Sequence, residues 1–394
     1  MTESAKIKTI IQFLLLCVVV IGLSYFVTST WVQKKETIPE KQSLVFEKSM
    51  TLAEFGRTNN LSNEMLQKVF ELKDKEAQQR QVSDFQLTED RITKKIEQAQ
   101  AIEAEHGSKN WQKIVVKFIL WFVILGTSFY LLRKGKILPG MRKILYLISL
   151  TVFGVILGAD PSAMGTVKDA IVLFAGKGVI CPPRMIALTL FLLLVFLANK
   201  FFCAWGCQLG TLQDLIFRIN RNKKDRKGIF RQVKLPFVVT NTIRIAFFIL
   251  FTIIAFAWTV DIVDLIDPFK IFKPAMIGVS GWVFLIVMLV ASLFVYRPWC
   301  SMFCPFGLVG WLVEKRSLFK IKVNYDTCIA CESCAKVCPS TVMETILKRE
   351  KTISDCFSCG SCLTECPSGS ITFGYGKRQL PPAGKFEKKQ TAEK

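Results

Sequence analysis

Long apolar stretches separated by charged segments form the main pattern of this chain. A helix crosses a bilayer with about 20 apolar residues. The stretches that approach or exceed this length predict six spans: 9–29, 113–132, 144–160, 185–200, 238–260 and 278–296. The fold class that we predict is therefore mainly α, a polytopic helical membrane protein.

The first apolar stretch could also belong to a cleaved signal peptide. It is longer than the usual core of about 7–15 residues, and no A-x-A cleavage site follows it. We therefore expect residues 1–33 to form a retained N-terminal membrane anchor.

Composition and charge fit a membrane protein and predict its orientation. The mean hydropathy is +0.36 and the net charge is +21. Positive residues gather in 133–143 and 200–234, whereas 160–184 and 261–277 mix Asp with a few Lys or Arg. Because Lys and Arg stay on the cytoplasmic side, we predict a multi-pass protein of the bacterial inner (cytoplasmic) membrane with both termini in the cytoplasm. The charge then needs no nucleic-acid partner.

Residues 34–112 are polar and nearly neutral, with 13 Lys or Arg against 14 Asp or Glu. A capping box, Thr51-x-x-Glu54, begins the first of three predicted helices. The second helix begins at Leu61 and the third at Leu87. We predict a periplasmic helical module, which is either a solvated spacer or a docking module for a partner.

The predicted membrane core, 113–319, contains an internal repeat. Residues 202–210 align with 299–307, and an Asp-Pro pair at 160–161 mirrors another at 267–268. Both units have the same orientation. They predict a parallel repeat whose pseudo-twofold axis runs along the membrane normal.

Eight of the 14 cysteines fall in two runs near the C-terminus. Each run reads C-x2-C-x2-C-x3-C-P, the bacterial ferredoxin spacing, in which the fourth cysteine ligates the other cluster. Zinc ligands usually form C-x2-C pairs separated by a longer loop, and disulfides need an oxidising compartment. We predict a two-cluster ferredoxin-like domain at 320–376 and a basic disordered tail at 377–394. The expected ligands of the two [4Fe–4S] clusters are Cys328, Cys331, Cys334 and Cys366 for the first, and Cys356, Cys359, Cys362 and Cys338 for the second.

Four more cysteines occupy matching positions in the two repeat units: Cys203, Cys207, Cys300 and Cys304. Residues i and i+4 of a helix share one face, so two such pairs could hold a further metal centre at the membrane face. They could equally form a redox-active dithiol site, or be buried structural thiols. Cys17 and Cys181 lie alone, and we expect them to act as small hydrophobic residues.

Several motifs are absent from the sequence. There is no C-x-x-C-H motif for covalent haem and no G-x-G-x-x-G motif for a dinucleotide. The single histidine, His106, lies outside the predicted spans. We therefore expect no haem, no catalytic residues, and an electron carrier rather than a self-contained enzyme. Four aspartates at the outer ends of spans could relay protons or touch a quinone headgroup, or simply end helices: Asp160, Asp261, Asp264 and Asp267.

The paired C-x3-C motifs followed by a two-cluster ferredoxin resemble the NapH/NosR-type membrane-bound polyferredoxins over roughly residues 115–375. The resemblance implies electron transfer across or along the cytoplasmic membrane, in support of periplasmic respiratory enzymes or of their metal-centre maturation. The chain departs from the family pattern at Cys207-Gln208, where Cys-Pro is common. Residues 162–166 also lack the flavin-attachment pattern, so no covalent flavin is expected.

These features predict a membrane-bound iron–sulfur protein that passes electrons between quinol or cytoplasmic donors and a periplasmic respiratory reductase or cytochrome. The alternative is a maturation factor that supplies electrons while the metal centre of a periplasmic or membrane reductase is built. A third hypothesis is a structural anchor that docks partners through residues 34–112.

Overall fold

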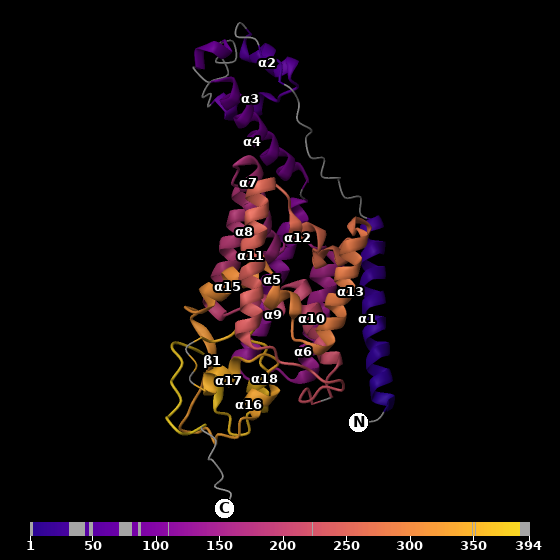
Figure 1. The fold of residues 1–394 in the computed structure, drawn as a ribbon, viewed down its shortest axis with the longest axis vertical. Helices are drawn as coiled ribbons and strands as arrows, with labels where there is room; N and C mark the ends of the chain where they lie inside the picture. Colours follow the sequence, from indigo (N-terminus) through magenta and orange to yellow (C-terminus); the bar gives the residue numbers. More distant parts are fainter. Residues whose placement is uncertain are drawn as a thin grey trace, which may run out of the picture.

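The computed structural model describes residues 3–30, 44–46, 50–70, 81–85, 88–108, 110–222, 224–348, 350 and 352–386. A helical bundle lies between a small helical module at one end and the cysteine-rich domain (residues 320–376) at the other (Figure 1). The start of α1 (Glu3–Thr30) lies at the end of the cysteine-rich domain.

The small module has a hydrophobic core of its own, in which Phe55 and Ile92 are buried. The predicted capping box is confirmed, because Thr51 Oγ1 accepts from the Glu54 N–H and the Glu54 carboxylate accepts from the Thr51 N–H at 3.0 Å. Residues 71–80 of this segment lie outside the described residues. Its described elements are α2 (Leu52–Thr58), α3 (Asn63–Phe70), the 3-10 helix η2 (Val82–Phe85) and α4 (Glu89–Ser108).

Each of the six predicted spans coincides with a helix in the bundle. The predicted spans 185–200 and 278–296 form shorter apolar helices, α8 (Pro182–Ala198) and α13 (Val279–Phe294). The total of six membrane crossings therefore stays a prediction. Within the described residues, four helices are long and apolar enough to cross a membrane: α1, α5 (Trp111–Arg133), α6 (Pro139–Ser149) with its π-helical continuation η3 (Leu150–Ile156), and α11 (Phe237–Trp258).

Two segments that the sequence treats as connections between spans contain helices. The outer connection contains α7 (Ala163–Lys177), and the basic connection contains α9 (Phe201–Trp205) and α10 (Gln208–Ile219). α10 is buried along nearly its whole length, and it packs between α6 and α13. Its charged residues are paired inside the protein, with Arg218 Nε 2.6 Å from the Asp214 carboxylate.

Short helices continue the second half of the bundle in the same order. α14 (Pro298–Met302) and α15 (Pro305–Glu314) follow α13 as α9 and α10 follow α8. The end opposite the cysteine-rich domain is closed by α12 (Ile262–Leu265), η4 (Pro268–Phe272) and η5 (Pro274–Met276).

The four aspartates at this end take part in local ion pairs or helix caps. Ion pairs and caps of this kind are typical of residues at helix ends. Here they hold the short elements in place. The ion pairs are Asp160–Lys273 (2.6 Å), Asp261–Lys168 (2.7 Å) and Asp264–Lys270 (2.8 Å). In the cap, the Phe269 N–H donates to the Asp267 carboxylate at 2.8 Å.

The cysteine-rich domain is built around a two-stranded antiparallel sheet. β1 (Phe319–Val323) pairs with β2 (Ile371–Tyr375), and Phe319 lies opposite Tyr375. Three short helices complete it, α16 (Ser333–Val337), α17 (Val342–Leu347) and α18 (Ser361–Glu365), with α16 packed on α18. Of the predicted tail, Arg378 donates to the Ile321 carbonyl at 3.0 Å, and 387–394 lie outside the described residues.

Candidate metal centres

Two cavities in the cysteine-rich domain are each lined by four thiols. Each set takes three thiols from one run and the fourth from the other, and these are the two sets that the ferredoxin spacing predicts. Cavity A, of about 330 Å³, is lined by Cys328, Cys331, Cys334 and Cys366. Cavity B, of about 370 Å³, is lined by Cys338, Cys356, Cys359 and Cys362.

The backbone follows the same path through both runs. Ala330 and Glu332 have positive φ angles of 55° and 54°, and the equivalent Ser358 and Gly360 have 49° and 77°. Turns that include left-handed residues direct successive N–H groups to one side, which suits a negatively charged group. The two loops are therefore shaped alike around their cavities.

The two cavities differ in their access to solvent. Cys331 of cavity A is exposed, whereas Cys338, Cys356 and Cys362 of cavity B are buried. Tyr296, which follows the bundle helix α13, also lines cavity B. Cavity A therefore lies at the surface, and cavity B lies against the bundle.

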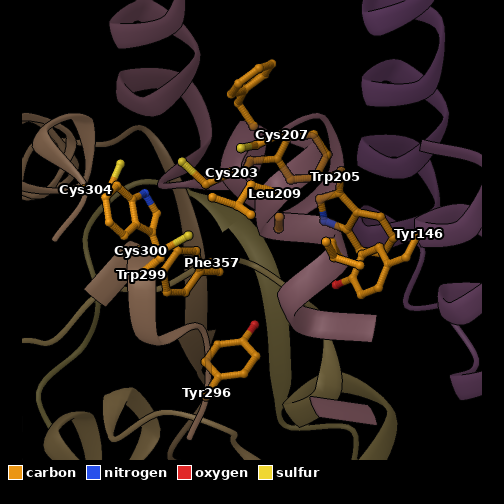
Figure 2. Packing of buried hydrophobic residues seen from close by; sticks show 14 of the residues in the cluster. Tyr146, Cys203, Trp205, Cys207, Leu209, Tyr296, Trp299, Cys300, Cys304 and Phe357 are labelled. Atoms are coloured by element: carbon orange, nitrogen blue, oxygen red, sulfur yellow. The ribbon is translucent and has the colours of Figure 1, made fainter. Parts of the chain in front are cut away.

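A third four-thiol cavity lies inside the bundle (Figure 2). The side chains of its four cysteines are 7–9% exposed and lie in the protein interior. Met164 and Phe269, from elements at the opposite end of the bundle, also line the cavity. Cavity C, of about 380 Å³, is lined by Cys203, Cys207, Cys300 and Cys304.

In each of the three sets, the four thiols line a cavity and do not converge on a single point. In the part of the chain that the structure describes, no three His, Cys, Asp or Glu side chains gather closely enough to hold one metal ion. Each cavity instead presents four thiols around a volume of similar size, 330–380 Å³. This arrangement fits a multinuclear cluster with four thiolate ligands.

Corresponding residues of the two halves shape cavity C. Cys207 and Cys304 are the N-cap residues of α10 and α15. Three residues further on, a Cβ atom at Gly210 or Gly307 would lie 2.3 or 2.6 Å from the carbonyl oxygen of the first cysteine in the same pair. Only glycine fits at these two positions.

Buried ion pairs join the bundle to the cysteine-rich domain beside cavities B and C. Asp355 precedes Cys356 and pairs with Lys200 at 2.5 Å and with Arg244 at 2.7 Å. Burial alone would raise the pKa of Asp355, but the charges of Lys200 and Arg244 outweigh burial and lower it. Asp355 is therefore held as a carboxylate between two cations.

The positively charged connections of the bundle meet the cysteine-rich domain. Arg142, from 133–143, donates to a hydroxyl of that domain at 3.0 Å. Arg226 and Lys234, from 200–234, donate to a carboxylate and a carbonyl of the same domain at 2.9 and 2.7 Å. The most basic connections and the eight ferredoxin-spaced cysteines therefore lie at the same end of the molecule.

Sequence reasoning missed several residues that surround these cavities. Lys200 and Arg297 carried a usable signal, because each is a cation three residues before a C-x3-C pair. Phe357 carried little signal beyond its place after Cys356, since the chain has 32 phenylalanines.

Comparison with family models assigns iron–sulfur binding to the same regions. A 4Fe-4S dicluster domain matches residues 320–367. This range contains all eight cysteines of the two runs and none of the cysteines of cavity C. A 4Fe-4S binding domain matches twice, at 180–227 and 277–324, and each match contains one C-x3-C pair. No solved structure gave a significant match.

The curated relatives include ferredoxin-type and electron-transport proteins. The candidate electron transport protein YccM of Escherichia coli (strain K12) is 30% identical over 51% of this chain and 57% of its own length. The ferredoxin-type protein NapH of Haemophilus influenzae is 27% identical over 36% of this chain and 48% of its own. The regulatory protein NosR of Pseudomonas aeruginosa is 26% identical over 35% of this chain and 20% of its own.

The chain thus spans about half the length of YccM and NapH. The family-model matches contain the C-x3-C pairs and the ferredoxin runs, and four helices of the described residues are suited to crossing a membrane. The chain is therefore homologous, over part of its length, to the NapH/NosR-type polyferredoxins, and its matched regions are 4Fe-4S binding domains.

Proposed function

We propose that this chain carries electrons through the inner membrane, between two [4Fe–4S] clusters in cavities A and B and a third centre in cavity C. The observation that carries the proposal is that each of the three cavities is lined by four thiols. When bound, each cluster takes up or releases one electron at a time.

The residues around each cavity have distinct tasks in this proposal. The four thiols of cavities A and B hold the ferredoxin clusters, as the spacing of the runs predicts. In cavity C, two of the thiols belong to the N-cap residues of α10 and α15, and the glycines let these helices lie close to the first cysteine of each pair. Lys200, which lines cavity C, offsets negative charge in a buried site, where unpaired charge is costly.

The proposed orientation places the cysteine-rich domain in the cytoplasm and the module of residues 34–112 in the periplasm. Its support is the basic character of the connections that contact the domain, since positive residues stay on the cytoplasmic side. In this orientation the bundle is a six-span parallel repeat. Met164 and Phe269 bring cavity C within reach of the periplasmic end.

Electrons then have an entry and an exit at opposite ends of the molecule. Cavity A, with its exposed Cys331, is the contact point for a cytoplasmic donor, and quinol is a further proposed donor from the membrane. The proposed acceptor is a periplasmic respiratory reductase or cytochrome, which the module of residues 34–112 would dock. No feature of the described residues favours the alternative of a maturation factor.

Reconstitution into liposomes tests the proposed function. The full chain is inserted with the cysteine-rich domain outward, a membrane-impermeant reductant is added outside, and ferricyanide is enclosed inside. We expect wild type and Cys17→Ser, which changes a lone thiol on α1, to reduce the enclosed ferricyanide. The double variant Cys203→Ser/Cys300→Ser should not, although it keeps the clusters of cavities A and B. Equal rates for wild type and the double variant would show that cavity C has no part in the path.

A further inference from the structure

One aromatic side chain lies between cavity B and cavity C. Phe357 follows Cys356 directly, and among the described residues it alone lines both cavities. Its side chain is buried, at 6% exposed. Figure 2 shows Phe357 beside Cys300 and Trp299, on the side of cavity C that faces the cysteine-rich domain.

The loop that carries Phe357 is fastened to the bundle on both sides of the ring. Asp355 pairs with Lys200, whose backbone N–H also donates to the Cys356 carbonyl at 3.3 Å. On the other side, the Ser358 carbonyl accepts from Trp205 Nε1 at 3.3 Å. These contacts hold the loop against the bundle, so the distance between the two cavities is set by the fold.

Cations and a second ring hold the phenyl ring itself. The Arg297 guanidinium carbon lies 4.6 Å from the Phe357 ring centroid, and Lys200 Nζ lies 5.7 Å from it. Tyr296 packs edge-on, with ring centroids 5.7 Å apart. A cation over an aromatic face is attracted to the ring electrons. The same guanidinium donates to the Cys203 carbonyl at 2.6 Å, so the ring is linked to the wall of cavity C.

We propose that Phe357 is the bridge through which an electron passes between the groups in cavities B and C, an inference that rests on the proposed function. One centre loses one electron and the other gains it, and no bond forms or breaks. A packed aromatic ring fills space that an electron would otherwise have to cross as a void. Electron tunnelling is faster through closely packed atoms than through a void. Protein interiors are close-packed, and a smaller side chain here would open a gap between the two sites.

The test compares three variants of the full chain, purified without oxygen. Phe357→Leu removes the bridging ring, and Phe357→Tyr keeps a ring at the same place. Phe306→Leu is the matched control, because Phe306 is buried and lines cavity C without lining cavity B. Iron per chain and the equilibrium EPR spectra are recorded first. An added photochemical reductant, excited by a light flash, then donates electrons to the ferredoxin side, and freeze-quench EPR follows the reduction of the third centre.

We expect all variants to keep the iron and the EPR signals of wild type. Phe357→Leu should slow reduction of the third centre several-fold, whereas Phe357→Tyr and Phe306→Leu should keep the wild-type rate. A normal rate in Phe357→Leu overturns the bridge and leaves the third centre standing. Loss of iron in Phe357→Leu alone overturns the bridge in favour of a packing role. A wild-type chain without a third signal overturns the third centre and the bridge together.

Discussion

Lys200 and Arg297 each reach across the bundle to the opposite cysteine pair. Each stands three residues before the first cysteine of its own pair. Lys200 Nζ donates to the Gly307 carbonyl at 2.7 Å, and Arg297 Nη1 donates to the Cys203 carbonyl at 2.6 Å. Both side chains are almost fully buried. Two buried cations therefore tie the two halves of the core together beside cavity C.

The first prediction concerns the stability that Arg297 provides. Arg297→Met removes one of the two cations that pair with the buried Asp214 carboxylate. Removing one partner of a buried ion pair typically costs about 3 kcal/mol or more. The matched control is Arg226→Met. The Arg226 side chain, which pairs with Glu365, is 54% exposed, and an exposed ion pair is worth about 1 kcal/mol or less. Unfolding in detergent measures both, and equal losses would contradict the buried network.

The second prediction concerns the glycines that let α10 and α15 approach the first cysteine of each pair. A methyl group at Gly210 would meet a backbone carbonyl at 2.3 Å, so Gly210→Ala should displace α10 from α9 and lower the iron bound in cavity C. Gly126→Ala, on α5, meets nothing within 4 Å and should bind iron like wild type. Iron analysis and EPR compare the two variants. If Gly210→Ala kept the full iron content, the close approach would not be needed.

A third prediction follows from the unequal exposure of the ferredoxin cavities. Because Cys331 is exposed while most thiols of cavity B are buried, mild oxidation with a chelator should remove the cluster of cavity A first. The Cys331→Ser variant identifies which EPR signal belongs to cavity A. Loss of both ferredoxin signals at the same rate would contradict the assigned order of exposure.

A fourth prediction concerns Asp267 at the opposite end of the bundle. Burial is the largest influence on this carboxyl and raises its pKa to about 7, against about 3.9 in an unfolded chain. Since the folded-state pKa is the higher one, the stability contributed by the neutral carboxyl is complete below about pH 4 and is lost as the pH rises through about 7.

Asp267→Asn should therefore flatten the decline of the unfolding midpoint between about pH 4 and pH 7. The Asp267 carboxylate accepts a hydrogen bond from the Phe269 N–H, and the side-chain oxygen of Asn can accept the same bond. Asp264→Asn, at a carboxylate that is 51% exposed, is the control and should leave the decline in place. A profile for Asp267→Asn that matches wild type would mean that Asp267 stays ionised in the folded protein.

Some of the fold could be predicted from local patterns alone. Runs of apolar residues located the bundle helices, and Thr51 with Glu54 located the start of α2. The spacing within the two cysteine runs predicted which thiols gather at cavities A and B, because short loops of fixed length leave little freedom.

The rest depends on contacts between distant segments. The charges of Asp214 and Arg218 give α10 the composition of a surface connection, and only their partners inside the bundle make burial possible. Phe357 looks like any other phenylalanine until the fold sets it between two cavities. Cavity C also requires two segments almost 100 residues apart to meet; the internal repeat suggested this pairing, whereas hydrophobic periodicity alone could not.

The central claim is that this chain holds three redox centres, one of them inside the membrane core. Iron and acid-labile sulfide per polypeptide, measured on anaerobically purified protein, test it most directly. The account predicts about twelve irons in wild type and about eight in Cys203→Ser/Cys300→Ser, since each cluster holds four. A wild-type chain with about eight irons, unchanged in the double variant, would contradict it.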